Sequence, residues 1–233
     1  MLTRITSLCF ALTLAAMAQN APAPAARTMA RIDALSAHWG DISRQLWENP
    51  EVGFNEVKSS ALVREELRAA GFRITENAGG MPTAFIAEWG QGKPVIAILG
   101  EYDALPGLSQ DAEPARSPRV TGAPGHGCGH NLFAAATAMA AIVAKEHLAA
   151  SGKSGTIRFY GSPAEEGGGG KIYLLRAGAF GDVDAALTMH PWDANQADDN
   201  SWLANISVRA RFRGKDAHAS AAPEQGRSAL DGL

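Results

Sequence analysis

Two segments in the first third of the chain have apolar residues on one helical face. Residues 30–49 repeat apolar side chains at intervals of three and four, and Pro50 would end a helix there. Residues 55–70 carry a comparable apolar face and are followed by Gly71, a residue that commonly ends helices. The pattern therefore predicts two helices.

Further along, short apolar runs alternate with helical patterns. A run that is apolar throughout, such as residues 94–99, is typical of a strand covered on both faces. The predicted strands are residues 83–89, 94–99, 156–160 and 183–189, and the helices between or after them are residues 132–150 and 171–177. This alternation predicts an α/β fold with a mainly parallel sheet flanked by helices, up to about residue 195.

The last segment of the chain has a different pattern. Residues 206–212 alternate between apolar and polar side chains, as expected for a strand with one wet face, and predict the start of an antiparallel unit. A helical pattern beginning at Ser228 reaches the end of the chain at Leu233. We therefore expect a truncated chain whose final part is only the beginning of a second domain.

The N-terminus has the features of an export signal. Arg4 precedes a nearly continuous apolar run over residues 5–18, which ends in an A-x-A cleavage motif. The run is shorter than the about 20 residues of a membrane span, and a Pro/Ala segment over residues 19–29 is typical of a linker. The mature protein is therefore expected to be periplasmic or secreted.

The composition narrows the class of protein. Hydrophobic residues make up 46% of the chain and charged residues 19%, which excludes a fibrous, collagen-like or disordered chain. Lys and Arg number 21 against 24 Asp and Glu, for a net charge of −3. Without a basic excess, we expect no nucleic-acid partner and no membrane partner after signal cleavage.

The motif GHGCGHN contains the first candidate chemistry. Because Cys9 lies in the predicted signal, Cys128 would be the lone thiol of an exported protein and must be buried, catalytic or bound to metal. His126 and His130 lie two residues to either side of it. Thiolate and imidazole are preferred ligands of zinc and similar metals, so this spacing predicts a metal site that needs further ligands from elsewhere.

Two other strand ends offer such ligands. Glu165 and Glu166 follow the strand at 156–160, and their side chains point in different directions, so one can hold a metal while the other accepts a proton. Taken alone, the pair also fits a solvated acidic turn. His190 follows the strand at 183–189. His218 lies in a Gly- and Ala-rich turn and could either donate to an oxyanion or be merely exposed.

Five motifs together resemble a known family. They are GEYDALPGLSQ at 100–110, GHGCGHN at 125–131, PAEEGGGGK at 163–171, MHP at 189–191 and GKDAHA with GRSALD at 214–231. In this order they resemble the aminoacylase-like dinuclear metallopeptidases. Within that family the resemblance is closer to the branch that holds a p-aminobenzoyl-glutamate hydrolase subunit and the indole-acetyl-amino-acid hydrolases.

The resemblance implies a role for each matching residue. Glu165 matches the general base, and His218 matches a lid histidine that stabilises the oxyanion in the partner subunit of a dimer. Asp103 matches an acidic residue behind the metals, and Glu101 is expected beside it. The residues that match ligands of two divalent ions, zinc or manganese, are Cys128, His130, Glu166 and His190, with Cys128 as the bridge.

The resemblance also implies an architecture and an activity. Residues 30–199 would form the N-terminal part of a zinc-peptidase-like catalytic domain, and residues 200–233 the start of an inserted α+β lid that dimerises. The expected reaction is hydrolysis of an amide bond in an N-acyl or aminobenzoyl amino acid or a short peptide, by a homodimer or with a second related subunit.

Two other hypotheses stay open at this point. Cys128 could be a nucleophile paired with His130 instead of a metal ligand. The chain could also be an inactive metal-binding remnant, or a partner of a full-length relative.

Overall fold

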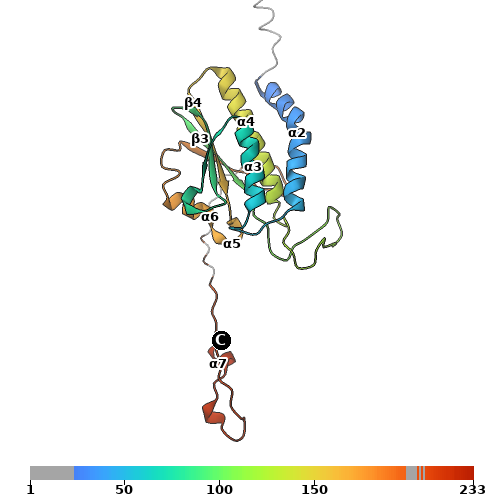
Figure 1. The fold of residues 1–233 in the computed structure, drawn as a ribbon, viewed down its shortest axis with the longest axis vertical. Coiled ribbons are helices and arrows are strands. Elements are labelled where there is room, and N and C mark those ends of the chain that lie inside the picture. Colours follow the sequence, from blue (N-terminus) through green and yellow to red (C-terminus); the bar gives the residue numbers. More distant parts are fainter. Residues whose placement is uncertain (1–23, 198–203, 205, 207) are drawn as a thin grey trace, which may run out of the picture. The chain divides into compact units, whose positions relative to one another are not determined.

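The chain divides into two units in the computed structural model, which describes residues 24–197, 204, 206 and 208–233 (Figure 1). The first unit ends at Asp193, and the second comprises Ala194–Leu233. The predicted signal over residues 1–18 lies outside the described residues, as does the predicted domain boundary near residue 200.

A sheet of five strands forms the centre of the first unit, in the order β1-β2-β4-β3-β5. The apolar runs predicted β2, β3, β4 and β5. Of these, β4, β3 and β5 are parallel neighbours, whereas β2 runs antiparallel to both of its neighbours. The bounds are β1 (Arg73–Glu76), β2 (Phe85–Gln91), β3 (Val95–Glu101), β4 (Gly155–Ser162) and β5 (Ala185–Leu187). Four strands thus point the same way, and the predicted α/β fold class is confirmed.

Strand β1 is absent from the sequence-based prediction. It has only four residues, RITE, and of these Ile74 alone is partly buried, so no apolar alternation marks it. It lies at the edge of the sheet, where Ile74 is in register with Ala87 of β2. A short polar edge strand is a common protection against further strand pairing, and it leaves little signal in the sequence.

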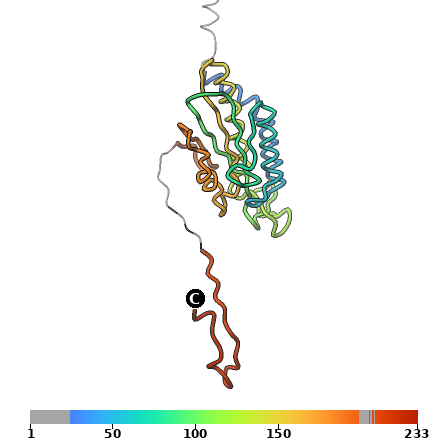
Figure 2. The backbone as a smooth tube through the Cα atoms, turned by 60° about the vertical axis from the view of Figure 1, so that its left-hand side comes forward, coloured from blue at the N-terminus to red at the C-terminus, as the bar shows by residue number. Residues whose placement is uncertain are grey.

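Helices cover both faces of the sheet (Figures 1 and 2). One face packs against α2 (Pro24–Glu48), α3 (Val57–Ala69) and α4 (His130–Ser151), and the other against α6 (Gly170–Arg176) and the short 3-10 helix η1 (Ala78–Gly80). Consecutive residues of β4 show the division, because Phe159 belongs to the first core and Tyr160 to the second. Successive side chains of the strand point to opposite faces of the sheet, so one strand contributes to both cores.

Two helices differ from the expectation at their first turns. Helix α2 begins at Pro24, so residues 24–29 of the predicted linker are helical; proline is tolerated in the first turn, where its missing N–H has no partner. Helix α4 begins at His130, and its length and apolar composition alone would suit a membrane span. Its buried residues nevertheless pack in the core described above, which makes it a core helix of this unit.

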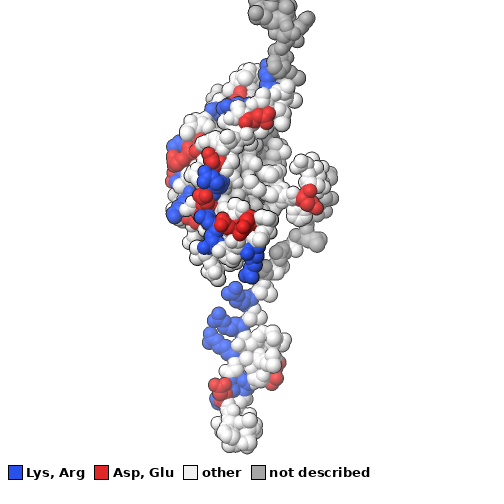
Figure 3. Space-filling model, turned by 90° about the vertical axis from the view of Figure 1, so that its right-hand side faces the viewer, with Lys and Arg blue, Asp and Glu red and all other residues white. Residues whose placement is uncertain are grey.

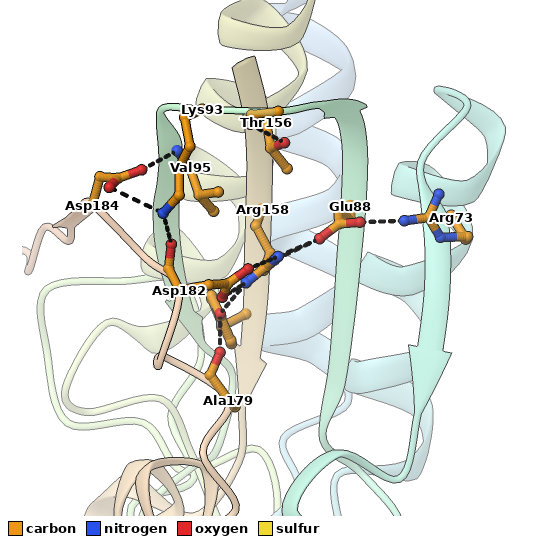
Figure 4. Close-up of polar contacts among 11 residues, drawn as sticks. Arg73, Glu88, Lys93, Val95, Thr156, Arg158, Ala179, Asp182 and Asp184 are labelled. Carbon is orange, nitrogen blue, oxygen red and sulfur yellow. Dashed lines mark hydrogen bonds and ion pairs between the residues drawn. The ribbon is translucent and has the colours of Figure 1, made fainter. Parts of the chain in front are cut away.

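A polar network between the sheet and the segment after α6 fixes the position of β5 (Figure 4). Arg158 of β4 donates to Glu88 of β2 at 2.7 Å and to Asp182 at 2.6 Å, and the Asp182 carboxylate raises the Arg158 pKa. Asp184, just before β5, accepts a hydrogen bond from the Val95 backbone N–H of β3 at 2.7 Å. These bonds attach the segment after α6 to the sheet and align β5 beside β3.

The second unit differs from its prediction. Among the described residues of the segment 206–212 there is no strand, and Ile206 and Val208 are exposed. An alternating segment forms a strand only where a neighbour accepts its backbone hydrogen bonds, and the described part of this unit pairs only Lys215 with Arg227, in an isolated antiparallel bridge. Basic residues occupy alternate positions over 209–215, and Figure 3 shows blue side chains along the extended part of this unit. The unit ends in η2 (Pro223–Gln225) and α7 (Ala229–Gly232).

Candidate metal centre

Adjacent parallel strands bring the predicted site residues to one edge of the sheet. Glu101 is the last residue of β3, Glu165 follows β4, and His190 follows β5. Because β4, β3 and β5 are neighbours that run the same way, their carboxyl ends meet, which is where ligands bind in open α/β sheets. Helix α4 begins at this edge with His130.

A first group of possible ligands consists of Cys128, His130 and His190. Their sulfur and nitrogen atoms all lie within 4.8 Å of one another, and the Cys128 Sγ lies 3.3 Å from the His190 Nε2. The His190 Nδ1 lies 2.8 Å from the Pro191 carbonyl oxygen, so Nδ1 carries the proton and donates it. The neutral ring therefore presents the lone pair of Nε2 to Cys128.

A second group shares His130 with the first. Here the possible ligand atoms of Glu101, His130 and Glu165 lie within 4.8 Å of one another. The His130 Nε2 is 3.1 Å from Glu101 Oε2 and 3.8 Å from Glu165 Oε2. Burial lowers the His130 pKa, but the contacts with Asp103 and Glu101 outweigh it and raise the pKa to about 10. This buried edge thus strongly attracts positive charge.

Asp103 orients both His130 and the turn that carries the paired glutamates. The His130 Nδ1 donates to the Asp103 backbone oxygen at 2.9 Å and lies 3.1 Å from Oδ1. The other carboxylate oxygen accepts a hydrogen bond from the Glu166 N–H at 2.9 Å. Burial raises the Asp103 pKa, but the bonds to His130 and Glu166 outweigh it and lower the pKa. A carboxylate behind a ligand histidine is the usual support of such a ring.

A buried glutamate that sequence reasoning missed supports the same turn. Ala164 has the left-handed backbone conformation, with φ 55°, which is uncommon outside glycine. Glu56, fully buried, accepts the Ala164 N–H at 2.8 Å and the Thr83 hydroxyl at 2.8 Å. A Cβ at Gly53 would lie 2.9 Å from the Ala164 Cα. The loop before α3 therefore fixes the strained residue that aims Glu165 and Glu166.

The position between Cys128 and His130 requires a glycine. Gly129 has φ +78°, and a Cβ there would lie 3.0 Å from the Pro191 ring. Gly129 therefore allows the segment that carries His190 to approach the segment that carries Cys128, which brings the two side chains together.

The chemistry of these side chains fits divalent metal ions. Among the predicted ligands and Glu101, three buried atoms lack a hydrogen-bond partner within the described part of the chain, namely Glu101 Oε2, His130 Nε2 and Glu166 Oε1. Burial, followed by the hydrogen bond and charge of Glu166, raises the Cys128 pKa to about 12. A nucleophilic cysteine needs the opposite shift, whereas a bound cation deprotonates a coordinating thiol. The set of sulfur, nitrogen and carboxylate donors thus favours a metal site over a thiol nucleophile.

The structure brings most, though not all, of the predicted site residues together. Cys128, His130, His190, Glu101 and Glu165 form the two groups, and Asp103 lies behind them. Glu166 is outside both groups but contacts Cys128, as the raised thiol pKa indicates. Their individual roles stay predictions.

The two other histidines of the motifs, His126 and His218, lie outside the two groups of possible ligands. His126 is buried outside both groups, and burial lowers its pKa to about 4, which keeps it neutral. His218 lies in the second unit, where its Nδ1 accepts hydrogen bonds from the backbone N–H groups of Ala221 at 3.1 Å and Ser220 at 3.3 Å. The proton of the neutral His218 ring is therefore on Nε2, and its predicted role toward the metals stays a prediction.

Comparison with known proteins decides the family. Residues 97–223, more than half of the chain, match Peptidase family M20/M25/M40. The chain belongs to this family. The family predicted from the five motifs is thereby confirmed.

Three members of the family show how similar the chain is to known proteins. The chain is 51% identical over 203 residues to a p-aminobenzoyl-glutamate hydrolase subunit of Escherichia coli, covering 87% of this chain and 42% of that protein. An IAA-amino acid hydrolase of Arabidopsis thaliana is 34% identical over 188 residues, covering 77% and 41%. A dinuclear metal-binding peptidase of the family from Bacillus subtilis superposes with a TM-score of 0.59 at 32% identity, over 68% and 43%. The chain thus spans less than half the length of each.

Proposed function

We propose that this chain belongs to a metal-dependent amidohydrolase that cleaves the amide bond of an N-acyl or aminobenzoyl amino acid such as p-aminobenzoyl-glutamate. The observation that carries the proposal is the convergence of Cys128, His130 and His190 with two carboxylates at one buried sheet edge. The 51% identity to the Escherichia coli p-aminobenzoyl-glutamate hydrolase subunit supports this substrate class.

In this proposal the chain holds two divalent ions, zinc or manganese, through Cys128, His130, Glu166 and His190. When bound, such ions polarise an amide carbonyl and lower the pKa of water. Asp103 holds His130 in the tautomer that leaves Nε2 free to bind. The Asp103 bond to the Glu166 N–H keeps the glutamate turn beside Cys128.

Glu165 is the proposed proton carrier of the reaction. Its side chain is partly exposed, as a group that meets substrate and water must be. Burial, and next the charge of Glu101, raise the Glu165 pKa, which brings a carboxylate closer to the range in which it exchanges protons near neutral pH. Glu165 accepts the proton of the attacking water and returns it to the leaving nitrogen.

His218 is the proposed donor to the oxyanion. Because its Nδ1 accepts backbone hydrogen bonds, the exposed ring carries its proton on Nε2 and can donate it. We propose that this residue acts in the site of a partner chain, within a homodimer or with a second related subunit. The Escherichia coli relative is itself named as a subunit.

The proposal predicts chelator-sensitive hydrolysis of p-aminobenzoyl-glutamate. Release of p-aminobenzoate by the purified chain should stop after dialysis against EDTA and return with added zinc or manganese. An indole-acetyl amino acid serves as a second amide substrate.

Activity that survives complete metal removal would contradict this mechanism and favour a Cys128 nucleophile. Bound metal without hydrolysis of any acyl amino acid would contradict the enzymatic proposal and favour a metal-binding partner of a longer relative.

We also propose that the protein is exported, on the basis of the apolar run over residues 5–18 and the motif that follows it. Expression of the chain in a bacterial host should yield a periplasmic product whose N-terminus is Gln19, by intact mass and N-terminal sequencing. A matched variant with Leu12→Arg in the apolar run should keep residues 1–18. An uncleaved cytoplasmic product from the unsubstituted chain would contradict export.

A further inference from the structure

The carboxylate of Glu101 faces two different groups at the end of β3. The side chain is nearly inaccessible, with 5% exposure. One oxygen, Oε1, accepts from the Lys171 ammonium at the start of α6, and the other, Oε2, lies 3.1 Å from the His130 Nε2. Neither Oε2 nor Nε2 has a hydrogen-bond partner among the described residues.

This close approach needs a positive charge between the two atoms. The His130 Nδ1 donates its proton to Asp103, so the charge that faces Glu101 Oε2 is carried at Nε2, either as a second ring proton or as a metal ion bound there. In the metal-free chain a second ring proton on Nε2 takes the place between these atoms, which lie 3.1 Å apart, and a divalent ion that replaced this proton would meet both atoms at once. In tetrahedral zinc sites, with bonds of about 2.0–2.2 Å, nitrogen and oxygen ligands lie about 3.3 Å apart. The observed separation therefore suits two ligands of one ion.

The ion pair with Lys171 leaves only one oxygen of the Glu101 carboxylate available to bind a metal ion. Its ammonium occupies Oε1, which turns Oε2 toward His130 and supplies a counter-charge to the carboxylate. A carboxylate fixed in this way binds a metal through one oxygen rather than two.

We propose that Glu101 is a direct ligand, through Oε2, of the ion that His130 binds, and that Lys171 fixes this carboxylate for monodentate binding. The proposal rests on the metal centre of the proposed function and adds a ligand to it. Sequence reasoning had expected Glu101 only behind the metals. The alternative is that Glu101 and Lys171 form a purely structural ion pair.

Zinc affinity separates these two roles. Competition with a chromophoric chelator measures it for the full chain and for Glu101→Gln, Lys171→Met and the control Glu146→Gln, which removes an ion-paired carboxylate on the exposed surface of α4. Since even residues that only orient ligands change affinity by about 10–100-fold, Glu101→Gln should lower it by about 100-fold or more. Lys171→Met removes only an orienting residue and should lower the affinity by about tenfold, less than Glu101→Gln does, and Glu146→Gln should match the parent.

A cobalt spectrum and a second variant identify direct ligation. Glu101→Gln should change the visible absorption of the Co²⁺-loaded chain, because that absorption reports the atoms bound to the metal. Glu101→His supplies a nitrogen donor without a carboxylate for Lys171, and should bind zinc more tightly than Glu101→Gln. Circular dichroism confirms that each variant is folded.

Three results would overturn the proposal. Unchanged zinc affinity and an unchanged cobalt spectrum in Glu101→Gln would refute ligation while leaving the proposed hydrolase intact. Equal losses in Glu101→Gln and Lys171→Met would assign the pair a structural role. If the unsubstituted chain binds neither zinc nor cobalt, the metal centre of the proposed function fails together with this ligand.

Discussion

Replacing Glu165 with glutamine is expected to lower the turnover of acyl amino acid hydrolysis by about 10²–10⁴-fold, the usual contribution of a general base. The amide keeps the size of the side chain but cannot accept a proton. The Glu165 oxygen closest to His130 lies 3.8 Å from its Nε2, farther than Glu101 Oε2 at 3.1 Å. The substitution should therefore leave the metal content nearly unchanged.

The measurement pairs kcat with metal content on the same preparation. Glu166→Gln is the matched comparison, because it alters the neighbouring carboxylate that is predicted to bind metal. It should lower metal content and activity together. If Glu165→Gln loses metal in proportion to activity, Glu165 is a ligand and its assignment as the base is wrong.

Replacing Glu56 with alanine is expected to lower the free energy of unfolding by about 3 kcal/mol. The substitution leaves two buried donors without an acceptor, the Ala164 N–H and the Thr83 hydroxyl. Each unsatisfied buried group destabilises by roughly 1–3 kcal/mol. It also removes the support of the left-handed Ala164, so the folded variant should hydrolyse its substrate more slowly.

Urea unfolding followed by circular dichroism measures this change. Glu146→Ala is the control, because an exposed ion pair contributes only about 0–1 kcal/mol. Glu56→Gln retains one acceptor oxygen and should fall between the parent and Glu56→Ala. If Glu56→Ala is as stable as the control, the buried hydrogen bonds do not stabilise the turn as described.

Most of the metal centre follows from local patterns in the sequence. Four strands were predicted from apolar runs, and the chemistry-bearing residues follow three of them or begin the next helix. Because parallel neighbours end at one edge, the sequence order places Cys128, Glu165 and His190 near each other without knowledge of the coordinates. The two carboxylates could also have formed a solvated turn, and the contact of Glu165 with His130 argues against that interpretation.

The remaining features depend on contacts that are distant in sequence. Glu56 and Ala164 are 108 residues apart, and no periodicity connects them. The Lys171–Glu101 pair likewise spans 70 residues. The alternating segment at 206–212 shows the converse limit, since the pattern of a strand predicts one only where a partner strand is present.

The metal content of the purified chain tests the central claim most directly. Mass spectrometry of the dialysed protein should find one to two transition-metal ions per chain, and the Cys128→Ala variant should lose them while it stays folded. Such a loss would establish Cys128 as part of a metal cluster at the sheet edge. A folded chain that carries no transition metal after loading with zinc or manganese, or a Cys128→Ala variant that retains its full content, would contradict the account.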